Sequence, residues 1–283
     1  MPAISLVICV YNEGELLRRL LQAAAGCYDD LVVVHDGPDT TGVRAIVETA
    51  GGRFFEGPRA RQQEPHWAMA WAQARTDWIL RLDADELPGE EMKRWLSNFR
   101  RQGDPDPQVS GYTCWWPLWN GKKAVTSAWP GGRNFLFNRR RVRFFGMVEQ
   151  VPVADDRFEP LPLILRHEPR RKSYGLYNVL VRQQAWHWRE CIALSLLGRP
   201  TDLPGWRWSG EAWPPEWEQI RRRPWRTALT RLMLGTFRSM RDQWRQEGKL
   251  LPLAALANPV HHCLVCLKYW QLRRRARHAE RPK

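Results

Sequence analysis

The segment WILRLDADE, residues 78–86, restricts the possible folds of this chain more than any other part of the sequence. Residues 78–82 have the length and the apolar, aromatic-containing composition of a short buried strand. Three acids follow within four positions, and Leu87-Pro88-Gly89 then predicts a break in the chain. Acids at the carboxyl end of a strand face the crevice in which open α/β sheets bind their ligands. The segment therefore predicts a ligand site at a strand end.

Asp83 and Asp85 are two residues apart, so on a continuing strand their carboxylates would share one face. Two carboxylates this close repel each other unless a cation lies between them, and hard oxygen ligands suit Mg²⁺ or Mn²⁺. Such an ion keeps few protein ligands and takes the others from substrate phosphates. An Asp-x-Asp motif is more often a solvated acidic turn. The order of the surrounding elements is what favours a metal site here.

Predicted strands and helices alternate along the first part of the chain. The runs ISLVICV and DLVVVHDG are as apolar as buried parallel strands. The predicted strands are 4–10, 30–37, 53–55 and 78–82, and helical patterns cover 16–21, 40–50 and 65–74. This alternation implies a parallel sheet with right-handed crossovers. The candidate site residues then lie at strand ends: Asn12, Asp36, Asp83 and Asp85.

Charge divides the chain into two segments. A length of 283 residues with 43% hydrophobic and 26% charged content indicates a globular protein of one large or two smaller domains. Residues 1–170 hold 22 basic and 22 acidic side chains, whereas residues 171–283 hold 22 basic and 8 acidic ones. The second segment therefore carries the whole net charge of +14. It predicts contact with an anionic partner, and phospholipid headgroups, nucleic acid and an acidic glycan all fit.

The six cysteines lack the spacing of a disulfide framework, which predicts a reducing environment. The first ten residues lack the basic start and the cleavage site of a secretory signal. No stretch approaches the ~20 apolar residues that span a bilayer. We therefore expect a cytoplasmic protein without a transmembrane segment, whose basic segment allows peripheral contact with the inner membrane face.

Several motifs together resemble the nucleotide-sugar domain of family-2 glycosyltransferases. They are LVICVYNE (6–13), LVVVHDG (31–37) and DWILRLDADE (77–86), in this order and spacing, the last containing the Asp-x-Asp (DXD) motif. WPGGRNFLFNRRRVRFFGMVEQV (129–151) is similar to the acceptor side of that family, and LILRHEP (163–169) to its closing metal-ligand segment. The most similar subgroup is the lipopolysaccharide-core glucosyltransferases.

The resemblance implies an α/β protein with the GT-A fold, a Rossmann-like domain with a mostly parallel sheet. The nucleotide-sugar domain would cover about residues 1–170, and residues 171–283 would form a basic, tryptophan-rich helical extension that contacts acceptor, membrane or nucleic acid. The residues assigned to the nucleotide-sugar pocket are Tyr11, Asn12, Glu13, Asp36, Arg61 and Asp83. Asp85 and Asp83 would bind the divalent cation that bridges the diphosphate, and His167 would be a further ligand through a neutral imidazole nitrogen.

Two positions depart from the pattern of the family. The usual Asp-Asp-Gly-Ser is His35-Asp36-Gly37-Pro38 here, so the resemblance does not extend to a base contact at His35. The subgroup's Val-His-Glu is replaced by Val148-Glu149-Gln150. Direct displacement at an anomeric carbon needs a base for the acceptor hydroxyl and stabilisation of the leaving diphosphate. Glu149 is the predicted base, with a surface acid as the alternative, and Asp85 would act in catalysis through the metal.

The segment 111–130 predicts an acceptor-binding loop. It contains Trp115, Trp116, Trp119 and Trp129. Indole faces stack on sugar rings and on nucleobases alike, although some of these rings will pack beneath a loop. Interleaved Pro, Gly and Asn argue against a core strand. Arg139, the first of three consecutive arginines, is also assigned to the acceptor site, as a phosphate contact.

The basic extension has a helical pattern. Residues 173–197 and a helix beginning at Pro224 show apolar spacings of three and four, and the Pro/Gly/Trp-rich stretch 198–224 between them predicts an irregular loop. Apolar residues from Trp225 to Trp244 form a stripe that is accompanied by arginines. A helix of this kind can lie in a membrane interface, although such a stripe more often packs on its own domain.

These observations predict an inverting, metal-dependent glycosyltransferase. It would move a hexose from a nucleotide sugar to a hydroxyl of an envelope glycan or lipid-linked saccharide, and the resemblance implies a UDP-hexose as the first choice of donor, because the family favours it. The alternative acceptor is a hydroxymethylated base in DNA, because phosphate binding and base stacking suit the same Arg and Trp content. A third hypothesis is a non-catalytic anion-binding protein on this fold. The altered 148–150 segment supports it, and the intact Asp83/Asp85 pair opposes it.

Overall fold

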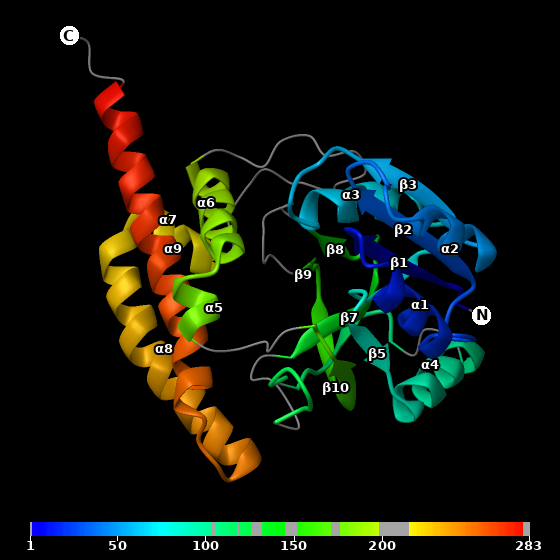
Figure 1. Cartoon of the computed structure of the whole chain (residues 1–283). Helices are drawn as coiled ribbons and strands as arrows, with labels where there is room; N and C mark the ends of the chain where they lie inside the picture. The colour runs from blue at the N-terminus through cyan, green and yellow to red at the C-terminus, as the bar shows by residue number, and fades with distance from the viewer. Residues whose placement is uncertain are drawn as a thin grey trace. The chain divides into compact units, whose positions relative to one another are not determined.

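The computed structural model shows two compact units, which Figure 1 draws in one view. The first unit holds the described residues up to 170, and the second holds those from 176 onward. The structure describes residues 2–102, 106–117, 119–125, 132–144, 152–170, 176–197 and 215–279.

Eight strands of the described residues form one mixed sheet in the first unit. Their order is β3-β2-β1-β4-β7-β6-β10-β5. The strands are β1 (Ile4–Val10), β2 (Asp30–Asp36), β3 (Arg53–Gly57), β4 (Trp78–Arg81), β5 (Glu86–Pro88), β6 (Val109–Trp115), β7 (Arg133–Asn138) and β10 (Arg157–His167). β3, β2, β1 and β4 run parallel, β7 is antiparallel to both of its neighbours, and β10 is parallel to β6. The predicted α/β fold with a mainly parallel sheet is confirmed.

Helices cover both faces of this sheet, which explains why its central strands are apolar throughout. They are α1 (Gly14–Ala23), α2 (Val43–Thr49), α3 (Glu64–Gln73) and α4 (Glu90–Gln102). All seven residues of β1 are buried, and they alternate between the core beneath α1, α2 and α4 and the core beneath α3. The predicted helix 40–50 begins only at Val43, after Gly42 takes a φ of 77°. Short β8 (Val142–Arg143) and β9 (Val153–Ala154) pair separately.

The segment after β4 differs from the prediction. β4 ends at Arg81, so Asp83 and Asp85 do not lie on a continuing strand; they lie in a turn in which the Glu86 amide donates to the Asp83 carbonyl at 2.9 Å. The predicted break at 87–89 is wrong as well, because Glu86–Pro88 forms β5 and pairs antiparallel with β10. Proline fits there because β5 is the outermost strand of the sheet.

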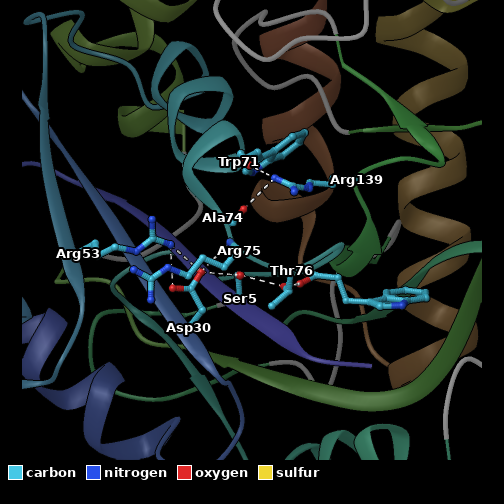
Figure 2. Close-up of polar contacts among 9 residues, drawn as sticks. Ser5, Asp30, Arg53, Trp71, Ala74, Arg75, Thr76 and Arg139 are labelled. Atoms are coloured by element: carbon cyan, nitrogen blue, oxygen red, sulfur yellow. Dashed lines mark hydrogen bonds and ion pairs between the residues drawn. The ribbon is translucent and has the colours of Figure 1, made fainter. Parts of the chain in front are cut away.

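A polar network ties the amino-terminal ends of three strands together, as Figure 2 shows. Asp30, at the start of β2, accepts hydrogen bonds from the Ser5 hydroxyl of β1 at 2.7 Å and from the Arg53 guanidinium at 2.8 Å. The Ser5 and Thr76 hydroxyls lie 2.8 Å apart, just ahead of β4. This edge of the sheet is therefore closed by side chains, which leaves the opposite edge for a ligand.

The second unit is helical, which confirms the predicted C-terminal helical extension. Its helices are α5 (Leu176–Leu180), α6 (Gln183–Leu197), α7 (Pro215–Arg222), α8 (Pro224–Glu247) and α9 (Pro252–Ala279). α6, α7, α8 and α9 share an apolar core that includes Ile192, Trp217, Ala228 and Val265. The predicted irregular loop 198–224 is wrong over 215–222, where α7 forms, and residues 198–214 lie outside the described part of the chain. Within the described residues, no helix is both long enough and apolar enough to cross a membrane.

Candidate functional site

The carboxyl ends of β2, β1 and β4 meet at one edge of the sheet. These three strands are neighbours and run parallel, so the residues that follow them come together although they are far apart in sequence. Tyr11–Glu13 follow β1, Asp36 ends β2, and Asp83–Asp85 follow β4. Open α/β sheets bind their ligands at such an edge.

The acidic turn after β4 rests on a buried ion pair. Glu86 is fully buried and accepts a hydrogen bond from the Asp83 amide at 2.8 Å. Arg133 Nη2 lies 2.9 Å from Glu86 Oε2 and also 2.9 Å from Asp83 Oδ2. Arg133 reaches this turn because it begins β7, whose antiparallel pairing with β4 brings its first residue to the carboxyl end of β4. Burial raises the pKa of Glu86 to about 7 against the opposing effect of Arg133.

Asp85 and His167 are the residues that could hold a divalent cation. His167 ends β10, and its Nε2 lies 3.5 Å from Asp85 Oδ2. The backbone fixes this approach, because the Glu168 amide donates to the Asp85 carbonyl at 2.8 Å. The Trp116 ring stacks on His167 with 4.0 Å between centroids. A carboxylate and an imidazole fit a cation that takes its other ligands from phosphate oxygens, and no group of three or more possible ligands occurs among the described residues.

Glu13 lies close to the same turn. Burial, followed by the negative charges of Asp85 and Asp83, raises the pKa of Glu13 to about 7 against the opposing charge of Arg170. Three carboxylates therefore share one electrostatic environment. A cation bound at Asp85 would relieve their repulsion.

Tyr11 presents an open aromatic surface at the end of β1. Its ring is 45% exposed and carries the Arg59 guanidinium at 3.5 Å from its centroid. His35 lies behind it, fully buried, where Nε2 accepts from the Asn12 amide at 3.2 Å. Nδ1 must then carry the proton, which it donates to the Gly37 carbonyl at 2.8 Å. Both ring nitrogens of His35 are thus used by backbone groups.

Asp36 holds the loop that follows β3. Its carboxylate forms an ion pair with Arg59 and accepts from the backbone amides of Ala60 and Arg61 at 2.5 and 2.9 Å. The His66 ring adds a fourth contact at 2.8 Å. Arg61 takes a positive φ of 58° within this loop. The contacts of Asp36 within the structure make it an anchor of this loop. Direct contacts of Asp36 and Arg61 with a nucleotide stay predictions.

The structure does not bring all of the predicted acceptor residues to the site. Arg139 follows the far end of β7, where its guanidinium donates to the Trp71 and Ala74 carbonyls at 2.7 and 3.0 Å and so caps α3 (Figure 2). Its assignment to the acceptor site is therefore corrected. Of the four tryptophans, Trp116 lies beside His167, Trp115 is 36% exposed at the end of β6, and Trp119 lies in a loop bridge to Ala124. Trp129 and Glu149 lie outside the described residues.

Sequence reasoning missed three residues beneath the turn: Arg81, Glu86 and Arg133. Arg81 is 1% exposed with its guanidinium 4.1 Å from the centre of the Trp67 ring, and burial lowers its pKa to about 9. An arginine in the middle of an apolar strand was the available signal for Arg81. Arg133 gives no such signal, because its place depends on the register of β7.

This arrangement, a mainly parallel sheet with an Asp-x-Asp turn at its carboxyl edge, defines the nucleotide-sugar domain of a glycosyltransferase with a GT-A-like fold. Residues 5–124 match the family described as Glycosyl transferase family 2. The match does not resolve a subgroup, so the similarity to the lipopolysaccharide-core enzymes stays a prediction.

Comparison with solved structures supports the fold. The mannosyltransferase PcManGT from Pyrobaculum calidifontis, in complex with GDP-Man and Mn²⁺, has a TM-score of 0.51 at 16% identity, over 95% of this chain and 87% of that one. S. aureus TarS in complex with UDP has a TM-score of 0.43 at 13% identity, over 95% of this chain and 91% of that one.

A curated relative shares only a short segment. A TPR repeat-containing protein of Synechococcus elongatus is 38% identical over 87 residues. The match covers 30% of this chain and 21% of that protein, so the chain spans about a fifth of the relative.

Proposed function

We propose that this protein transfers a hexose from a nucleotide sugar to a hydroxyl of an envelope glycan or a lipid-linked saccharide, with inversion at the anomeric carbon. The observation that carries the proposal is the convergence of Asp85 and His167, 3.5 Å apart, at the carboxyl edge of the parallel sheet. A UDP-hexose is the first candidate donor. PcManGT, which shares the fold, was solved with GDP-Man and Mn²⁺, so GDP-mannose is the second.

Asp85 and His167 would hold the divalent cation, Mn²⁺ or Mg²⁺. When bound, the cation supplies neutralisation of the charge that develops on the leaving diphosphate. Asp83 has a different task, because Arg133 already engages its Oδ2. Its Oδ1 is buried and has no hydrogen-bond partner among the described residues. A ribose hydroxyl that donated to this oxygen would satisfy it.

The opposite side of the reaction needs a base. Glu149 is our candidate: its carboxylate would take the proton of the acceptor hydroxyl while the oxygen attacks the anomeric carbon and the bond to the diphosphate breaks. Trp116 supports an acceptor site nearby, since it packs on His167 and offers an indole face of the kind that sugars stack on.

A donor-hydrolysis screen tests the proposal. Purified protein is incubated with UDP-glucose, UDP-galactose, UDP-N-acetylglucosamine and GDP-mannose, with Mn²⁺ or with EDTA, and release of the nucleoside diphosphate is measured. We expect one donor to be hydrolysed only with the cation, and not by the Asp85→Ala variant. Acceptor trials with that donor follow. Absence of both binding and hydrolysis for all donors would favour a non-catalytic role.

A further inference from the structure

Helix α8 leaves a row of large apolar side chains exposed to solvent. The row, called here the α8 stripe, consists of Trp225, Leu229, Met233, Phe237 and Trp244, whose exposed fractions range from 55% to 66%. The first four are spaced by four residues, so they follow one side of the helix. The side of α8 that faces its own unit buries Ala228 and Gln243. Packing within the second unit therefore does not account for the stripe.

Arginines accompany the stripe along its carboxyl-terminal half. Arg238, Arg241 and Arg245 are exposed and lie on the side of the helix next to Phe237 and Trp244. Arg241 pairs with Asp242 at 2.7 Å. Over their whole lengths, α8 and α9 contain nine arginines and one lysine against one aspartate and one glutamate. The surface around the stripe is therefore strongly cationic.

The amino-terminal end of the stripe is basic as well. Trp225 packs edge-on against Trp270 of α9 with ring centroids 5.0 Å apart, and the Arg274 guanidinium lies 5.5 Å from the centre of the Trp270 ring. Arg273, one residue earlier, donates to the Arg221 carbonyl at 2.6 Å. The stripe thus has an aromatic pair at one end and Trp244 at the other, and positive charge lies on either side of it.

We propose that the α8 stripe docks on an anionic lipid bilayer, with α8 lying in the plane of the headgroups. Apolar side chains enter the boundary between headgroups and acyl chains, while arginines bury their aliphatic parts and keep their charges at lipid phosphates. Tryptophan suits this boundary because its ring is apolar and its N–H is polar. The inference goes beyond the transfer reaction, since it concerns the second unit alone and needs neither donor nor acceptor.

Two other occupants fit less well. Nucleic acid would satisfy the arginines and could stack on the aromatic rings of the stripe, but it would leave Leu229 and Met233 in water, because these side chains have no ring on which a base can stack. A second copy of this chain would set one strongly cationic surface against another, which like charge opposes. A bilayer with anionic headgroups satisfies both the apolar and the charged components.

Vesicle sedimentation with the full-length protein tests the proposal. Wild-type protein is mixed with vesicles of phosphatidylcholine plus phosphatidylglycerol, or of phosphatidylcholine alone, over a rising salt series. We expect at least ~10-fold stronger binding to the anionic vesicles, and a fraction of that binding that resists salt. Replacing Arg238, Arg241 and Arg245 by Gln should weaken binding to anionic vesicles about 100-fold at low salt.

The stripe itself is tested with the double variant Leu229→Glu/Phe237→Glu, whose two positions are 60% and 66% exposed in the wild-type protein. In this variant, the salt-resistant part of the binding to anionic vesicles should be at least ~10-fold weaker than in wild type. The matched control is Leu194→Glu on α6, in the same unit and 53% exposed, which should bind as wild type does. Equal binding by wild type and the stripe variant would overturn the proposal.

Two parallel measurements cover the rival occupants. In a gel-shift assay, the protein could bind duplex DNA tightly and with a steep dependence on salt. If it did so without binding vesicles, the partner of the α8 stripe would be nucleic acid and not a bilayer. The wild-type protein could instead form a concentration-dependent dimer that the stripe variant does not form. If it did so without binding vesicles, the partner of the α8 stripe would be a second copy of this chain.

Discussion

Arg133 Nη2 lies 2.9 Å from Glu86 Oε2, and this ion pair supports the turn that presents Asp83 and Asp85. Glu86 is fully buried, and it also accepts the Asp83 amide proton at 2.8 Å. The pair joins β7 to the turn from below, so the carboxylates above it are held without help from a bound ligand. The geometry of the proposed metal site therefore depends on residues that would not touch the metal.

Breaking this pair should destabilise the protein strongly. Arg133→Met leaves the Glu86 carboxylate buried without its partner, and we expect the free energy of unfolding to fall by ~3–5 kcal/mol. Adding Glu86→Gln should recover part of the loss, because no buried charge then remains unpaired. Urea unfolding of the two single variants and the double variant measures this coupling. Strictly additive losses would show that the pair is not an energetic unit.

Removing the proposed metal ligands should abolish transfer and leave the fold intact. In wild-type protein, Mn²⁺ together with a nucleoside diphosphate should raise the melting temperature, since ligands that bind only the folded state stabilise it. Asp85→Ala and His167→Gln should lose both this shift and the activity. Activity that persists in EDTA, or in the Asp85→Ala variant, would exclude metal-dependent transfer.

Glu149→Gln keeps the shape of the side chain and removes its ability to accept a proton. Turnover should fall by ~10²–10⁴-fold with donor affinity little changed. Steady-state kinetics and donor titration separate the two effects. Turnover close to that of wild type would move the base to another acid, with Asp155 or Asp156 as the next candidates.

The raised pKa of Glu13 makes stability depend on pH. This pKa rises from its ordinary value of 4.5 to about 7 in the folded protein, so between these values the folded state keeps a proton that the unfolded chain releases. The free energy of unfolding should therefore fall as pH rises from about 4.5 to 7, by at most about 3 kcal/mol. Metal binding should strengthen over the same range, because the cation favours the charged carboxylate.

Glu13→Gln provides the test. Without metal, this variant should be more stable than wild type above pH 7 and no more stable below pH 4.5. Glu15→Gln, at an exposed position two residues further along in the first turn of α1, is the control and should follow the wild-type profile. Parallel pH profiles for wild type and Glu13→Gln would contradict the prediction.

The parts of the fold that were predictable are those with a local signal. β1, β2 and β4 are apolar runs ended by polar residues, and helical patterns separate them, so their order and the site at their carboxyl edge follow from the sequence. β5 was missed because Pro88-Gly89 is a breaker signal nearly everywhere except at an edge strand. A proline does disfavour a central strand, but the edge position of β5 depends on the order of all the strands in the sheet, which the local sequence does not show.

The residues assigned to the acceptor side show more clearly what the sequence could not predict. Arg133 begins the six-residue strand β7 and Arg139 follows it, so about 20 Å of extended chain separates the two and they serve opposite edges of the sheet. Sequence proximity to the acceptor motif favoured Arg139, whereas the antiparallel register of β7 brings Arg133 to the turn. Asp36 is similar: the sequence predicts its position but not the four donors that occupy it.

The short strand β5 also decides how this sheet can grow. Among the strands that the structure describes, it is the last on its side, has three residues, and ends in Pro88, which has no backbone N–H to donate. A strand added at this edge would find too few backbone N–H donors to form a regular ladder of hydrogen bonds. Association by strand addition is therefore directed to the opposite end of the sheet, where β3 is outermost, and the end that carries the acidic turn is guarded against aggregation.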